Sequence, residues 1–200
     1  MSPPALIDGA PTTVEDRILD AMVDCIARWG VGKTTADDIA RSAGVSRATL
    51  YRAFPGGKDV AFEALLRHET ERFFAAVTDP LAEAETLEDL VVVGIVEAAR
   101  FLTSHEALRY VMEHEPERVL PAFAFHRLDA ALATATAFTV PHLARFVPDA
   151  DRAAAGAEWL VRLLLSYAVN PSPTLDLTAP HSVRAFVRTY VLPVLDPTAA

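Results

Sequence analysis

Apolar residues recur at steps of three and four along almost the whole chain. This spacing places them on one face of an α-helix, and no sustained alternation with a period of two predicts a strand. A capping box from Thr12 to Glu15 is predicted to begin the first helix, and Gly30 and Gly32 to end it. The predicted buried face of this helix consists of Val14, Ile18, Ala21, Met22, Cys25, Ile26 and Trp29. The pattern therefore predicts an all-α fold.

Caps and breaks in the sequence divide the remaining chain into further helices. Thr34 or Thr35 is predicted to begin a short helix that ends at Gly44, and a third helix follows Ser46 and runs to about Phe54. A long fourth helix is expected from Lys58 to about 78, ending before a proline at 80. The later helices are predicted near residues 86–103, 105–114, 117–144, 150–169 and 181–195.

The segment from Thr34 to Phe54 has the pattern of a helix-turn-helix. Ile39 and Leu50 supply core positions on its two short helices, and Gly44 stands at the tight turn, where a positive φ is required. The second helix of such a motif enters the major groove of DNA. In this chain it offers side chains that can contact base edges and phosphates, namely Arg47, Thr49, Tyr51 and Arg52.

Charge changes the interpretation of this segment. The 200-residue chain has 18 Lys and Arg against 27 Asp and Glu, a formal charge of −9, and 52% of its residues are hydrophobic. From Arg28 to Lys58, however, six basic residues face two acidic ones. A local basic face on an acidic protein favours DNA binding at that face and discourages indiscriminate binding elsewhere.

The sequence resembles the TetR family of bacterial transcriptional regulators between about Val14 and Leu66. The residues that carry the resemblance are Gly30, Thr34-Thr35, Ile39-Ala40, Ala43-Gly44-Val45-Ser46, Thr49-Leu50-Tyr51, Phe54 and Lys58. The resemblance implies phosphate contacts from Thr35, Ser46, Tyr51 and Lys58. It places Arg47, Thr49 and Arg52 on the side that faces the groove. One departure is Gly56-Gly57, where the family commonly has a single small residue before the lysine.

The resemblance also implies a domain organisation. Residues 1–12 are expected to form a flexible tail, residues 13–58 a three-helix helix-turn-helix DNA-binding domain with a linking helix to about 78, and residues 80–200 a larger helical ligand-binding and dimerisation domain. The candidates for an apolar effector pocket are Phe101, Tyr110, Phe123, Phe125, Phe138 and Trp159. Apolar stripes on the last two helices give the dimer interface candidates Leu160, Val161, Leu164, Val183, Phe186, Val187, Tyr190 and Val191.

These features predict a homodimeric regulator, expected to be a repressor, that binds a palindromic double-stranded DNA operator and is released by a small apolar or amphipathic effector. The alternative is a helical-bundle enzyme or small-molecule-binding protein that retains the motif as scaffold. An enzyme has little support, because no G-x-S-x-G nucleophile motif occurs and Cys25 lies on an apolar helix face. No cofactor or metal is expected, since the six histidines lack the spacing of a di-iron or zinc site. A cytoplasmic location without membrane contact is also expected.

Overall fold

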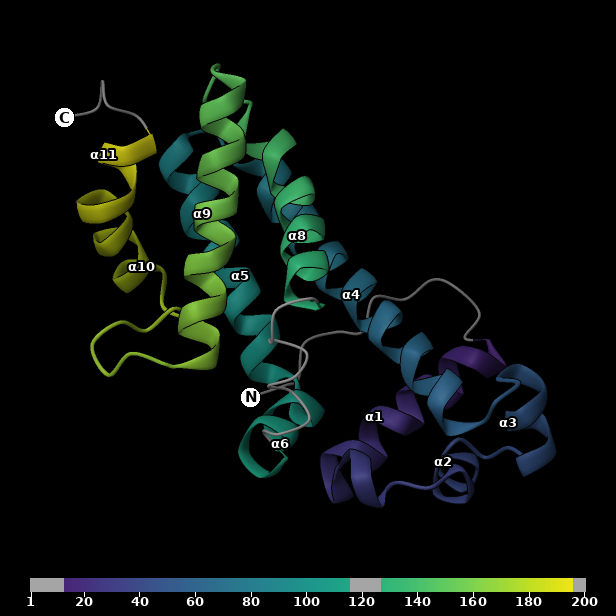
Figure 1. Ribbon diagram of the computed structural model, residues 1–200. Helices are drawn as coiled ribbons and strands as arrows, with labels where there is room; N and C mark the ends of the chain where they lie inside the picture. Colours follow the sequence, from purple (N-terminus) through teal and green to yellow (C-terminus); the bar gives the residue numbers. More distant parts are fainter. Residues whose placement is uncertain (1–12, 116–126, 196–200) are drawn as a thin grey trace. The chain divides into compact units, whose positions relative to one another are not determined.

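A computed structural model describes residues 13–115 and 127–195 of the chain (Figure 1). These residues form helices and connecting turns without a strand, so the predicted all-α fold class is confirmed. The chain divides into two compact units, Met1–His68 and Glu69–Ala200, and the division falls inside one long helix, α4 (Lys58–Glu83). Each unit has its own set of packed helices.

The first unit begins with α1 (Val14–Lys33), which is interrupted at Gly30 by a φ of 80°. Its capping box joins Thr13 and Asp16, one position later than the predicted pair, because Thr13 has the extended backbone of an N-cap. Val14 and Trp29 are 43% and 41% exposed, so the predicted buried face is wrong at both ends of the helix. Residues between them, such as Ile18 and Met22, are completely buried.

Two short helices complete the motif, α2 (Ala36–Ser42) and α3 (Arg47–Ala53), each with a hydroxyl N-cap. Thr35 caps α2 through a reciprocal box with Asp38, and Ser46 caps α3. The turn between the helices requires Gly44, whose φ is +66°. Ile39 of α2 and Leu50 of α3 are fully buried and fix both helices to the core of this unit.

The second unit contains the end of α4, α5 (Leu87–Ser104), α6 (Glu106–His114), α8 (Arg127–Leu143) and α9 (Ala150–Val169). A last continuous helical stretch is made of α10 (Pro180–Phe186), a π-helical turn (Val187–Val191) and α11 (Leu192–Leu195). Figure 1 shows α9 between α8 and this C-terminal stretch. The shared core of the unit includes Val96, Leu143, Ala157 and Val187.

The predicted end of α4 before Pro80 is wrong, because the helix continues through Pro80 to Glu83. Proline removes one backbone donor from a helix interior but does not by itself end the helix when tertiary contacts support the next turn. Arg145 supplies such support from beyond α8. Its guanidinium donates to the carbonyl oxygens of Leu81, Ala82 and Ala84 at 2.8, 3.2 and 2.7 Å.

Candidate nucleic-acid interface

The orientation of α3 follows from its cap and its single buried residue. The Ser46 hydroxyl oxygen accepts a hydrogen bond from the Thr49 amide at 3.0 Å and lies 2.8 Å from the Thr49 hydroxyl. Leu50 has no exposed surface and holds the helix against the core. Arg47, Tyr51 and Arg52 are thereby exposed to solvent, and Thr49 is half-buried. A recognition helix presents its side chains to DNA from such an exposed side.

Three long polar side chains occupy the exposed side of α3. Tyr51 is 41% exposed, and the Arg47 guanidinium carbon lies 5.4 Å from the centre of its ring. Arg47 also donates to the Tyr51 hydroxyl at 3.5 Å and to Asp37 of α2 at 3.2 Å, and these two partners raise the pKa of Arg47. Within the described chain Arg52 is exposed and has no hydrogen-bond or ion-pair partner.

The hydroxyl predicted to contact phosphate from α2 is already part of a cap. The Asp38 carboxylate accepts from the Thr35 hydroxyl at 2.5 Å and from the Thr35 amide at 3.2 Å, and these two hydrogen bonds lower the pKa of Asp38. In return, the Thr35 hydroxyl oxygen accepts from the Asp38 amide at 3.2 Å. The Thr35 side chain is exposed. Its oxygen therefore lies at the solvent-facing start of α2, where the helix dipole favours an anion.

Lys58, at the start of α4, is turned back onto the end of α1. Its ammonium donates to the Val31 carbonyl oxygen and is half-buried. An ammonium has three protons, so this bond leaves two for another acceptor. The structure requires glycine at position 57, directly before Lys58. Gly57 has a φ of +71°, and a Cβ there would lie 2.8 Å from the Tyr51 ring.

One residue that orients the motif was not predicted from the sequence. Arg17 of α1 donates to the carbonyl oxygen of Ala43 at 2.7 Å, at the end of α2 and beside the Gly44 turn. A Cβ on Gly44 would lie 3.4 Å from the same guanidinium. An arginine on the polar face of a helix gives no periodic signal that distinguishes it from a solvated one, so only the structure identifies it.

The predicted effector pocket is only partly brought together. Phe101 of α5 and Phe138 of α8 take part in an aromatic cluster with two residues of α4, Phe73 and Phe74. Ring centres lie 5.4 Å apart for Phe73 and Phe101 and 4.5 Å apart for Phe74 and Phe138. All four rings are half-buried. We refer to these four phenylalanines as the aromatic cluster.

The other pocket candidates lie elsewhere. Tyr110 stacks on His114 with ring centres 4.5 Å apart, and Trp159 is 36% exposed on α9. Phe123 and Phe125 lie outside the described residues. Among the candidates that the structure describes, aromatic character alone therefore does not identify a common lining.

A polar pair beside the aromatic cluster also escaped prediction. His105 Nδ1 accepts from the Leu108 amide at 3.1 Å and so caps α6, which assigns the ring proton to Nε2. Nε2 then donates to the Glu69 carboxylate at 3.0 Å. Burial raises the pKa of Glu69, but the hydrogen bond from His105 and the charge of Arg72 outweigh it and lower that pKa overall. Burial lowers the pKa of His142, whose ring lies 5.1 Å from that of Phe138.

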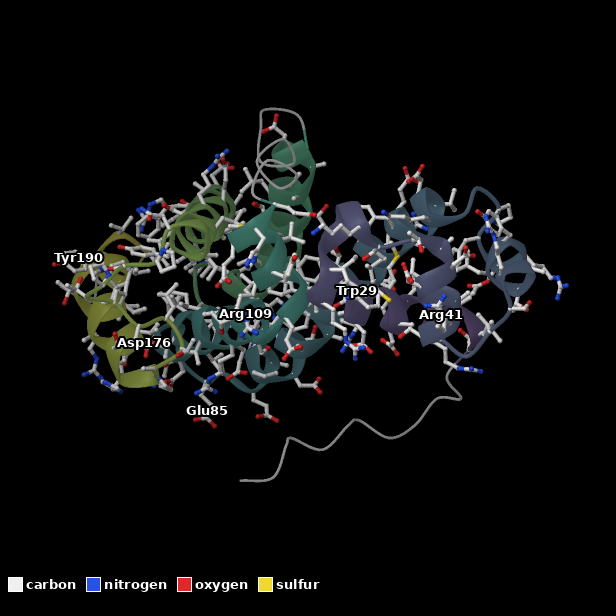
Figure 2. The ribbon with its side chains drawn as sticks, turned by 90° about the horizontal axis from the view of Figure 1, so that it is seen from below. Trp29, Arg41, Glu85, Arg109, Asp176 and Tyr190 are labelled. Atoms are coloured by element: carbon white, nitrogen blue, oxygen red, sulfur yellow. The ribbon has the colours of Figure 1, made fainter. Side chains whose placement is uncertain are left out.

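The dimer candidates require a correction. Val183, Val187 and Val191 have no exposed surface, and Leu160 and Val161 are only 8% exposed, because they form the core of their own protomer. Leu164 and Phe186 are half-buried against that core. Tyr190 is different: it is 62% exposed and projects from the C-terminal stretch (Figure 2). An apolar stripe at helical spacing thus reports burial, but it cannot distinguish the chain's own core from a partner.

Membrane-spanning helices and metal-binding clusters are both absent from the described ranges. No helix there is long and apolar enough to cross a membrane. No group of three or more His, Cys, Asp or Glu residues there is arranged to hold a metal ion. Cys25 is buried, as predicted, and burial raises the pKa of its thiol.

Sequence comparison agrees with the helix-turn-helix geometry. Residues 18–65 match the sequence model of the family described as bacterial regulatory proteins, tetR family. An HTH-type transcriptional regulator of Mycobacterium bovis is 34% identical over 103 residues, which cover 52% of this chain and 52% of that protein. The aligned segment thus spans about half the length of the curated relative.

Structural comparison extends over both units. The TetR family repressor AlkX of Dietzia sp., implicated in biodegradation of n-alkanes, has a TM-score of 0.62 at 22% identity and covers 94% of this chain and 100% of its own. The fatty acid degradation regulator FadR of Bacillus halodurans has a TM-score of 0.64 at 21% identity, with coverages of 90% and 96%. At these identities the similarity establishes the fold.

Proposed function

We propose that this chain, which belongs to the tetR family of bacterial regulatory proteins through its N-terminal unit, acts as a homodimeric repressor that an apolar or amphipathic effector releases from DNA. The observation that carries the DNA-binding part is the exposed side of α3. There Arg47, Tyr51 and Arg52 project from a helix that Ser46 caps and Leu50 anchors. Arginine reads guanine in the major groove through a bidentate pair of hydrogen bonds.

The proposal keeps the predicted assignment of some interface residues to the major groove and others to the phosphates. Arg47, Thr49 and Arg52 would face the groove, and Thr35, Ser46, Tyr51 and Lys58 would contact phosphates. The two uncommitted protons of Lys58 support the phosphate role. The exposed Thr35 hydroxyl donates its one proton to Asp38, so a phosphate contact from it would replace that hydrogen bond. The acidic pair Asp37 and Asp38 is engaged by Arg47 and Thr35, which reduces its repulsion of the DNA backbone.

A gel-shift titration with DNA fragments selected from the source genome tests this assignment. Arg47→Ala and Arg52→Ala should each weaken binding about tenfold, the size of one lost base contact. Arg109→Ala, which removes an exposed arginine from α6, is the matched control and should bind as the wild type does. Wild-type affinity in both α3 variants would disprove the recognition-helix assignment.

Dimerisation is proposed through the outer surface of α9 and the C-terminal stretch. Trp159, Tyr190 and Val194 are exposed there at 36%, 62% and 61%, and large apolar side chains so exposed favour a protein interface. The two-fold symmetry of such a dimer matches an operator built as an inverted repeat, in which successive half-sites lie about 34 Å apart. Light scattering should give twice the chain mass, and Tyr190→Asp should shift the mass toward that of one chain.

The effector is proposed to enter the aromatic cluster. Its four half-buried rings come from α4, α5 and α8, and a ligand among them would change how α4 packs. The lowered pKa of His142 keeps that neighbour neutral near pH 7, which suits an apolar ligand. Two structural neighbours support the same class of effector, since one is a repressor implicated in biodegradation of n-alkanes and the other is a fatty acid degradation regulator.

A fluorescence anisotropy assay tests the effector. Medium-chain fatty acids and alkyl alcohols, added to the protein–DNA complex, should lower the anisotropy of labelled DNA. Phe138→Ala should weaken this response and leave DNA affinity without ligand unchanged. A response of equal size in Phe138→Ala would locate the effector elsewhere.

A further inference from the structure

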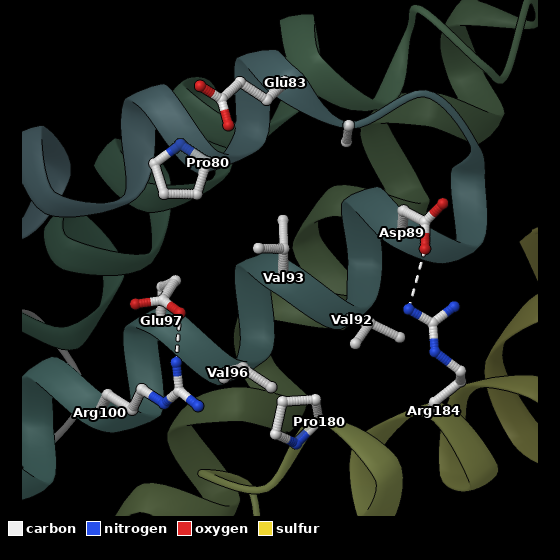
Figure 3. Close-up of a pocket in the computed structure, with 11 residues that line it drawn as sticks. Pro80, Glu83, Asp89, Val92, Val93, Val96, Glu97, Arg100, Pro180 and Arg184 are labelled. Carbon is white, nitrogen blue, oxygen red and sulfur yellow. Dashed lines mark hydrogen bonds and ion pairs between the residues drawn. The ribbon is translucent and has the colours of Figure 1, made fainter.

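A cavity lies on the side of α5 that faces α10 and the end of α4 (Figure 3). It has a volume of about 330 Å³, and the aromatic cluster contributes none of its lining. Three valines of α5, Val92, Val93 and Val96, form an apolar floor, and the rings of Pro80 and Pro180 border it. A volume of this size lies near the lower end of the range for ligand pockets, about 300 to 1,000 Å³.

Charged side chains surround this floor, and most of them neutralise one another. Arg100 donates to Glu97 at 2.8 Å across one turn of α5. Arg184 of α10 donates to Asp89 at 2.9 Å and also to Glu88 at the start of α5. Figure 3 shows the two pairs that line the cavity, each joined by a dashed line. These arginines are therefore committed to acids of the same protomer.

Glu83 is the exception among the charged lining residues. It is exposed at the end of α4, and within the described part of the chain its carboxylate has no hydrogen-bond or ion-pair partner. Arg145 approaches the same turn, but its protons go to the carbonyl oxygens of Leu81, Ala82 and Ala84, and it does not line the cavity. One carboxylate thus remains uncompensated at the edge of an apolar floor.

We propose that this cavity binds a small amphipathic organic cation. Its apolar part lies on the valine floor and its cationic group pairs with Glu83. The apolar body contributes by burying surface, and the charge gives selectivity, because an anion of the same shape would meet Glu83 unfavourably. The site is separate from the aromatic cluster and does not depend on the function proposed above.

Calorimetric titration of the full chain with three probes of equal chain length tests the charge requirement. The probes are hexylammonium, hexanol and hexanoate. Hexylammonium should bind about fivefold more tightly than hexanol, the effect expected of one partly exposed ion pair, and hexanoate should bind most weakly. Equal affinity for hexylammonium and hexanoate, or no detectable binding of hexylammonium, would overturn the proposal.

Variants then locate the bound cation. Glu83→Gln should remove the preference for hexylammonium over hexanol. Glu85→Gln makes the same change two residues away, at an exposed position that does not line the cavity, and should keep the preference. Val93→Phe fills the floor and should weaken both hexylammonium and hexanol. An unchanged preference in Glu83→Gln, or unchanged binding of both probes in Val93→Phe with a wild-type melting temperature, would place the ligand elsewhere and refute the site.

Discussion

The guanidinium of Arg47 on α3 lies 3.2 Å from the carboxylate of Asp37 on α2. Both side chains are more than half exposed, so water screens the pair and the arginine is readily transferred to another acceptor. The pair holds the Arg47 guanidinium, which is proposed to face the DNA groove, in place while the protein is free. DNA binding would exchange Asp37 for a base or phosphate.

Removing this competitor should strengthen DNA binding. Asp37→Asn frees Arg47 and deletes one negative charge from the interface, so the affinity for DNA should rise about two- to fivefold at low salt. Asp151→Asn makes the same change in net charge on α9 and serves as the control for binding isotherms measured by anisotropy. Equal gains in both variants would mean that net charge, and not the Arg47 pair, limits affinity.

The role of Arg52 can be separated into charge and base recognition. Arg52→Lys keeps the charge but loses the bidentate fork, so discrimination between selected and random DNA should fall about tenfold while the salt dependence stays unchanged. Arg52→Ala should lose both. The measurement is the ratio of dissociation constants for the two DNAs over a salt series. If Arg52→Lys keeps full discrimination, Arg52 contacts phosphate only.

Arg17 should stabilise the first unit through its bond to Ala43. Arg17→Met keeps much of the aliphatic stem but leaves the carbonyl oxygen at the end of α2 without this donor, which should cost about 1 to 2 kcal/mol. Thermal unfolding should show a lower melting temperature and DNA affinity should fall. Arg28→Met, on the exposed side of the same helix, removes the same charge without this hydrogen bond and should leave the melting temperature unchanged. A melting temperature equal to that of the wild type would show that the bond contributes nothing.

Gly57 should be intolerant of a side chain. Gly57→Ala places a Cβ 2.8 Å from the Tyr51 ring and forces an L-residue to a φ of +71°. The strain should lower stability by about 1 to 2 kcal/mol, and the displaced Tyr51 ring should weaken DNA binding. Tyr51→Ala/Gly57→Ala removes the contact and reports how much of the stability loss comes from the backbone. An unaltered melting temperature in Gly57→Ala would contradict the geometry.

The second unit should lose stability in acid through Glu88. Hydrogen bonds from Arg188 and Arg184 lower the pKa of Glu88 below its usual value of 4.5. A depressed pKa in the folded state stabilises the protein above the unfolded pKa, and this contribution disappears as the pH falls through the folded pKa. Glu88→Gln should therefore melt at a lower temperature than the wild type at pH 7, and the difference should shrink below pH 4.5. A difference that does not vary with pH would exclude the ionic contribution.

The helix-turn-helix could be predicted from the sequence because its determinants are local. Thr35, Gly44 and Ser46 fix caps and a turn within a few residues, and Ile39 and Leu50 supply the core contacts that the spacing indicates. The same local rules failed at Pro80, where Arg145 supports the helix from 61 to 64 residues away. A rule that considers only the residues next to Pro80 cannot take account of hydrogen bonds from Arg145.

The second unit was harder to predict because its interfaces depend on tertiary packing. The stripe Val183, Val187 and Val191 is apolar at helical spacing, as a dimer face would be, yet it is buried within the protomer. The Glu69–His105 pair joins α4 to the N-cap of α6 across 36 positions of sequence and leaves no periodic signal. The place of Phe73 and Phe74 in the aromatic cluster was not predicted either. An aromatic residue in a helix indicates that its side chain is buried, but it does not indicate which residues it contacts.

The exposed side of α3 is proposed to recognise a specific DNA sequence. The most direct measurement is selection of genomic DNA fragments by the purified full chain, in parallel with the Arg47→Ala/Arg52→Ala double variant. The wild type should enrich fragments that share an inverted repeat with half-sites about one helical turn apart, and the double variant should enrich none. Absence of a shared sequence in the wild-type pool, or the same sequence in both pools, would contradict the account.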